Sequence, residues 1–139
     1  MQKLILVLVA ACILFTGCGD GLSKSELQSA QAAADKAIEL EKNGSYPEAL
    51  THIDGAITKG GLNPDQLSEA YLLRARCLCA ADKLEDAERD LGFAEQGSPN
   101  PASWHYSRAI LLGKQKKITE SKAVFSKAVR IDPKLKMPQ

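Results

Sequence analysis

Cysteine and histidine are the residue types in this 139-residue chain that could ligate a metal ion or act as a nucleophile. Cys77 and Cys79 lie two positions apart, and His52 and His105 lie far from them in the sequence. Zinc sites use paired ligands at loop spacing, which these residues lack. Residues two apart in a helix point about 200° away from each other, which excludes a Cys77–Cys79 disulfide. We expect no metal site and at least one buried thiol, and a disulfide to a partner stays open.

Catalytic arrangements leave spacing signals that this sequence does not show. A nucleophile beside a base, a carboxylate pair or a glycine-rich phosphate loop would be the usual signs of an enzyme. Gly60-Gly61 is the nearest approach to such a loop, but it follows a predicted helix and has no phosphate-binding lysine. It fits the C-cap of a helix better. We therefore expect a protein that binds rather than catalyses and that has no cofactor.

The first residues have the pattern of an export signal. A positive start, Met1-Gln2-Lys3, precedes an apolar run of 12 residues from Leu4 to Phe15, which is too short to span a bilayer. We assign residues 1–17 to the signal and expect the mature chain to begin at Cys18. A plain secretory signal, with Cys18 left as an ordinary thiol, is the alternative.

The junction Leu14-Phe15-Thr16-Gly17-Cys18-Gly19 resembles the bacterial lipobox, with Phe15 where leucine is usual. The resemblance implies a lipid on Cys18, such as palmitate, and anchoring to a membrane of the bacterial cell envelope. Gly19 in place of aspartate favours the outer membrane where two membranes are present. Residues 18–23 would be a short tether that keeps the following domain close to the bilayer.

Charge is divided between the two halves of the mature chain. Residues 18–101 carry 8 basic and 15 acidic side chains, net −7, whereas residues 102–139 carry 9 basic and 2 acidic, net +7. We expect the basic end to contact an acidic protein, an anionic lipid or a cell-wall polymer, unless it is only a solvated end. Nucleic acid is not expected, because export separates the chain from it. The basic patch consists of Lys116, Lys117, Lys122, Lys127 and Arg130.

A pattern of small and apolar residues repeats along the chain. The residues Ala75, Leu78, Ala87, Leu91, Ala94 and Pro99 recur 34 residues later as Ala109, Leu112, Ser121, Phe125, Ala128 and Pro133. An earlier copy runs from Ala37 to Ala56. We expect helices near 24–43, 47–59, 64–81, 84–96, 101–116 and 119–131. Helix caps are expected at Ser23, Ser45 and Asn63, each followed three residues later by Glu or Gln.

These segments resemble tetratricopeptide repeats over roughly residues 30–133, including Tyr46-Pro47-Glu48-Ala49-Leu50 and Leu84-Glu85-Asp86-Ala87-Glu88. The resemblance implies an all-α, right-handed α-solenoid of three helix hairpins at 24–61, 64–99 and 101–133, with a short tail at 134–139. Where the two helices of a hairpin touch, small residues are needed: Ala37 with Ala49, Ala75 with Ala87, and Ala109 with Ser121. The chain departs from the family at its leucine position, with Lys36, Arg74 and Arg108, and at its tryptophan position, with Ala33 and His105.

In this family a groove lined by the first helix of each hairpin takes up extended or helical peptides. The corresponding groove residues here would be Ile38, Leu72, Arg76, Cys79, Tyr106, Ile110 and Lys114. The implied function is a membrane-anchored, non-enzymatic scaffold or adaptor that binds a protein or peptide, which the basic end would favour as acidic. The alternative is a structural envelope protein that uses the same surface to form a homo-oligomer.

Overall fold

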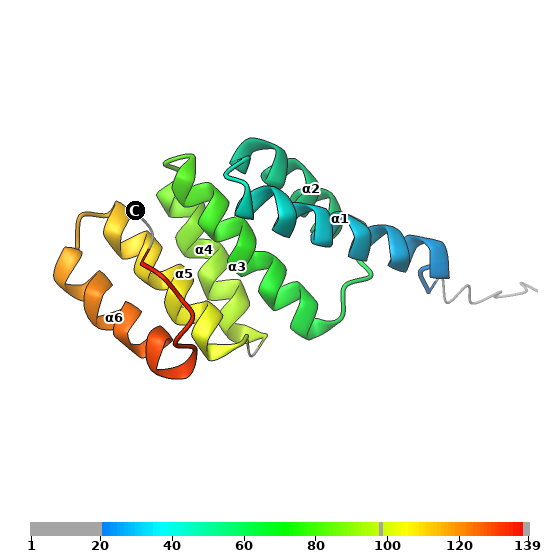
Figure 1. Ribbon diagram of the computed structural model, residues 1–139. Coiled ribbons are helices and arrows are strands. Elements are labelled where there is room, and N and C mark those ends of the chain that lie inside the picture. The colour runs from blue at the N-terminus through cyan, green and yellow to red at the C-terminus, as the bar shows by residue number, and fades with distance from the viewer. Residues whose placement is uncertain (1–20, 98, 138–139) are drawn as a thin grey trace, which may run out of the picture.

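The computed structural model describes residues 21–97 and 99–137, and it is all-α over that part of the chain (Figure 1). The expected signal and Cys18 lie outside the described residues. Helix bounds agree with the sequence expectation to within about two residues, as assignment of helix ends allows. The six helices are α1 (Lys24–Lys42), α2 (Tyr46–Lys59), α3 (Pro64–Ala80), α4 (Leu84–Gln96), α5 (Pro101–Lys114) and α6 (Ile118–Ile131).

Consecutive helices pack as pairs, α1 with α2, α3 with α4 and α5 with α6, and the pairs follow one another in chain order (Figure 1). The first helix of each pair contacts the first helix of the next, α1 with α3 and α3 with α5. Helix α3 is therefore the central helix and packs against neighbours on several sides. One face of the molecule is formed by α1, α3 and α5.

Helix starts follow the cap chemistry that the sequence predicts, with one exception. The Ser23 hydroxyl accepts from the Glu26 backbone N–H, and the Glu26 carboxylate accepts from the Ser23 N–H at 2.7 Å. Asn63 and Gln66 form the same reciprocal box at the start of α3. Ser45 precedes α2, but its side chain makes no capping hydrogen bond. Because Pro47 has no N–H to satisfy, this start needs fewer capping partners.

The turn inside each helix pair has the same backbone conformation. One residue per turn has a left-handed φ: Gly44 at 78°, Asp82 at 61° and Lys116 at 63°. The next N–H donates to a carbonyl five residues earlier, at 2.9 Å in all three turns: Ser45 to Leu40, Lys83 to Leu78 and Lys117 to Leu112. This is the Schellman pattern of a helix C-terminus. The repeat in the sequence is thus also a repeat in the backbone.

Small residues lie between the two helices of each pair, as predicted. Ala37, Ala49, Ala75, Ala87 and Ala109 are all at most 1% exposed. In the last pair the Ser121 hydroxyl, in place of an alanine, donates to the Ala109 carbonyl at 2.7 Å, so a buried polar group is satisfied. The larger core side chains include Ile53, Leu91 and Leu111, which are buried between pairs.

Arginines at the family's leucine position bridge neighbouring helix pairs. Arg74 donates to Asp90 on α4 at 2.6 and 2.7 Å and to Asp54 on α2 at 2.9 Å. Arg108 contacts Glu88 on α4 at 3.2 Å. Asp90 is only 3% exposed, so its charge needs this bidentate partner. The departures from the leucine pattern therefore replace apolar contacts with ion pairs between pairs.

The left-handed turns predict a test of backbone strain. Gly44→Ala should lower the free energy of unfolding by about 1 kcal/mol, because an L side chain is strained at a φ of 78°. Gly55→Ala is the matched control: neither glycine has an atom within 4 Å of an added Cβ. Gly55 lies inside helix α2, so alanine should stabilise there by about 1 kcal/mol. Urea denaturation measures both, and equal signs would contradict the turn assignment.

Candidate binding groove

Two adjoining pockets lie on the face formed by α1, α3 and α5. The first, which we name the lysine pocket, has a volume of about 630 Å³ and is lined by Glu41, Lys42, Tyr46, Arg76, Ala80, Ser103, Tyr106, Ile110, Lys114 and Leu135. The second, the apolar pocket, has a volume of about 410 Å³. It is lined by Gln31, Ala34, Ile38, Glu41, Lys42, Ile53, Asp65, Gln66, Glu69, Ala70, Leu73 and Arg76. Because Glu41, Lys42 and Arg76 line both, the two pockets form one continuous groove.

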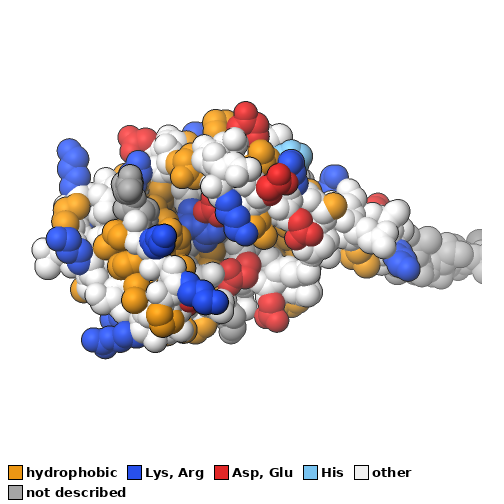
Figure 2. All heavy atoms as spheres, viewed as in Figure 1, with side chains coloured by type: hydrophobic (Ala, Val, Ile, Leu, Met, Phe, Trp, Pro, Cys, Tyr) orange, Lys and Arg blue, Asp and Glu red, His pale blue; other side chains and the backbone are white. Residues whose placement is uncertain are grey.

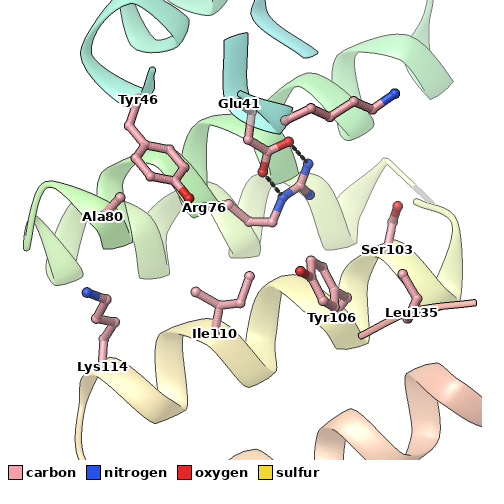
Figure 3. Close-up of a pocket in the computed structure, with 10 residues that line it drawn as sticks. Glu41, Tyr46, Arg76, Ala80, Ser103, Tyr106, Ile110, Lys114 and Leu135 are labelled. Carbon is pink, nitrogen blue, oxygen red and sulfur yellow. Dashed lines mark hydrogen bonds and ion pairs between the residues drawn. The ribbon is translucent and has the colours of Figure 1, made fainter. Parts of the chain in front are cut away.

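An ion pair between Arg76 and Glu41 lies at the junction of the two pockets (Figure 3). The guanidinium donates from Nε and Nη2 to the two carboxylate oxygens at 2.5 and 2.9 Å, and from Nη1 to the Ser107 hydroxyl at 3.0 Å. These side chains come from α3, α1 and α5. One group thus joins the first helices of all three pairs.

Electrostatics keep the Arg76 guanidinium charged. Burial alone lowers its pKa, but the hydrogen bond and charge of Glu41 more than offset this, so the pKa lies above its ordinary value. The two side chains are only 15% and 18% exposed. A charge pair so far removed from water depends on having all of its hydrogen bonds.

The lysine pocket presents cationic and hydroxyl donors. Figure 3 shows the Tyr46 hydroxyl directed toward Arg76, with Lys114 and Tyr106 on the α5 side of the pocket. Burial raises the pKa of the Tyr106 hydroxyl, so it stays protonated and can donate. In the described part of the chain neither Lys42 nor Lys114 forms an ion pair. The pocket therefore offers two ammonium groups and two phenols to an anionic group of a ligand.

Five of the seven predicted groove residues line the groove. Arg76, Tyr106, Ile110 and Lys114 line the lysine pocket, and Ile38 lines the apolar pocket. Residues that the prediction missed include Tyr46, at the start of α2, and Leu135, beyond α6. A helical spacing counted along first helices gives no signal for either.

The structure does not bring Leu72 and Cys79 to the groove. They are 0% and 1% exposed and belong to the core between α3, α4 and α5. The groove stripe of α3 consists of Glu69, Leu73, Arg76 and Ala80, which is rotated by one residue, about 100°, from the predicted stripe. The equivalent of Leu72 one repeat later, Tyr106, does line the groove, because no further helix covers α5 as α5 covers α3.

Both thiols are free and buried, as expected for at least one of them, and no Cys77–Cys79 disulfide is formed. Burial raises the pKa of Cys77 to about 12 and that of Cys79 to about 11, so both remain protonated near neutral pH. In residues 21–97 and 99–137, His, Cys, Asp and Glu form no group of three that could hold a metal ion. The two thiols act as core side chains.

The basic patch lies at the α5–α6 end of the molecule. Figure 2 shows Lys and Arg side chains around that end, whereas most Asp and Glu side chains gather toward α1 and α3. The five patch residues, Lys116, Lys117, Lys122, Lys127 and Arg130, are exposed, and none is in an ion pair within the part that the structure describes. The division of charge in the sequence is therefore also a division in space.

No helix in the described part of the chain has the length and apolar character needed to cross a membrane. No protein-family model, curated protein or solved structure matches the chain.

The buried ion pair predicts a strong dependence of stability on Glu41. Glu41→Leu should lower the free energy of unfolding by about 3 kcal/mol, because it leaves the Arg76 charge buried without a partner. Adding Arg76→Met should recover most of that loss. The control is Glu39→Leu, which breaks the exposed Lys36–Glu39 pair and should cost less than about 1 kcal/mol. Denaturant unfolding of the four variants measures the coupling, and equal losses at Glu41 and Glu39 would contradict it.

Proposed function

We propose that the chain is a tetratricopeptide-type protein that binds a segment of another protein in the groove of α1, α3 and α5. The 34-residue spacing, the three equivalent turns and the small residues inside each pair support a right-handed α-solenoid of three hairpins. A solenoid of this kind offers an extended binding face rather than a closed active site. The proposed role is a non-enzymatic scaffold or adaptor.

The observation that carries this proposal is the continuity of the groove. An apolar pocket and a pocket with ammonium and hydroxyl donors share one wall, formed by Glu41, Lys42 and Arg76. Binding sites for peptides combine apolar contact area with a few placed polar groups. A segment with an apolar side chain and, further along, an acidic one would complement the two pockets.

Self-association is the second candidate function, and the distribution of charge favours it. The net charges of −7 and +7 in the two halves of the mature chain make two copies mutually attractive in an antiparallel or head-to-tail arrangement. The exposed basic patch also suits an acidic protein or another anionic surface of the cell envelope.

We further propose that the protein acts in the bacterial envelope, held by a lipid on Cys18 and favouring the outer membrane where there are two. The support is the junction that ends in Thr16-Gly17-Cys18 after an apolar run. One acyl chain binds membranes only reversibly, so stable anchoring would need more than one. The partner would then be a protein that reaches the same membrane surface.

Photocrosslinking from Tyr106 tests the groove. With benzoylphenylalanine at Tyr106, we expect a distinct protein to be captured in the native membrane and identified by mass spectrometry. Phe93 is the matched control, since it is an aromatic residue on α4, 44% exposed and outside both pockets. The same species captured from both positions would refute a groove-specific partner. Capture of this chain alone from Tyr106 would make self-association the primary function.

Lipidation predicts different outcomes for two cysteines of the first segment. Cys18→Ser should abolish incorporation of an alkyne analogue of palmitate and release the chain from the membrane fraction. Cys12→Ser should leave both unchanged, because Cys12 lies inside the proposed signal. Gel fluorescence after click labelling measures incorporation. Equal labelling of the Cys18→Ser variant and the wild-type chain would exclude Cys18 as the attachment site.

A further inference from the structure

The two pockets of the groove differ in their chemistry. The apolar pocket has a floor of Ala34, Ile53, Ala70 and Leu73, with the partly exposed Ile38 at its side. Two carboxylates, Asp65 and Glu69, line it from α3. The nearby Arg76 charge is offset by Glu41. Figure 2 shows Asp and Glu side chains gathered on this part of the face.

The segment after α6 has the complementary chemistry. Lys134, Leu135, Lys136 and Met137 alternate basic and apolar side chains. In an extended strand, alternate side chains point to opposite sides, so Leu135 and Met137 can face a pocket while both lysines face its rim. Such a segment suits an apolar pocket that has carboxylates at its edge.

In its own molecule this segment lies against positive charge. It folds back along α5 (Figure 1), where Leu135 lines the lysine pocket with Lys114. Met137 lines a neighbouring depression with Lys114, Lys122 and the exposed Ile118. Lys134 and Lys136 are themselves exposed. The segment therefore places further positive charge on the basic end, where like charges oppose its retention.

We propose that residues 134–137 of a second copy occupy the apolar pocket, with Leu135 or Met137 on its floor and the flanking lysines near Asp65. The proposal rests on the groove's being the binding site and names a second copy as one of its ligands. Charge complementarity favours this location over the basic end. Once the segment has moved, Leu135 no longer lines the lysine pocket, which leaves that pocket free for an acidic group of another partner.

Binding of a labelled peptide tests the pocket. The probe is a fluorescein-labelled peptide of residues 131–139, added to the full chain in detergent and followed by fluorescence anisotropy. We expect saturable binding that weakens with salt. Asp65→Lys should weaken it about fivefold or more, the upper range for an exposed ion pair. Ile38→Asp should abolish it, since the pocket side would become charged.

Matched controls separate this site from a general charge effect. Glu95→Lys makes the same change of charge at an exposed position on α4 that lines neither pocket, and should leave the affinity unchanged. Thermal unfolding followed by circular dichroism checks that each variant is folded. Equal affinities of the wild-type, Asp65→Lys and Ile38→Asp chains, or no saturable binding, would overturn the proposal.

Co-purification of differently tagged copies tests whether the segment comes from a second molecule. The variant K134E/K136E and the variant D65K should each fail to pair with itself. Together they should pair, because the native segment of one can reach the native pocket of the other. Failure of the mixture, where the wild-type chain pairs, would refute exchange between copies. Capture of a distinct protein from Tyr106 would still stand in that case, so the groove and this occupant fail separately.

Discussion

A guanidinium can leave water only where its charge and its fixed set of donors meet partners, and Arg76 meets them on two other helices. Glu41 on α1 takes two of its hydrogen bonds and Ser107 on α5 takes a third. Because the donors lie in one plane, α1 and α5 are held at fixed positions on either side of α3. The two pockets meet at this ion pair, so the shape of the groove depends on it.

The back of the molecule uses a second arginine of α3 in a comparable way. Arg74, two residues before Arg76, joins α2 and α4 through Asp54 and Asp90. Residues two apart point to different sides of a helix, so α3 is tied to its neighbours on both faces. Apolar packing between the pairs is contributed mostly by small and medium side chains, and polar bridges of this kind fix their register more directionally than apolar contacts can.

Local signals made the helices predictable, whereas the covering of each helix by its neighbours was not. Helix ends and the small contacts inside each pair depend on residues close in sequence, such as Ser23 with Glu26, or at a constant offset, such as Ala75 with Ala87. Leu72 was misplaced because its burial depends on how α5 lies on α3, which a helical wheel does not contain. Tyr46 and Leu135 reach the groove from a turn and from the segment after α6, outside any first-helix pattern.

Anchoring at Cys18, as proposed, would give the division of charge a direction. Residues 18–23 could span at most about 20 Å when fully extended, so the start of α1 would stay near the bilayer. The basic patch lies around α5 and α6, at the other end of the order of helices (Figure 1). Attraction to anionic lipids decays over about 8 Å at physiological salt. A molecule standing on α1 would thus present its basic end to something other than its own membrane, whereas one lying flat would present it to the headgroups. Which surface the patch meets follows from orientation, and orientation follows from what occupies the groove.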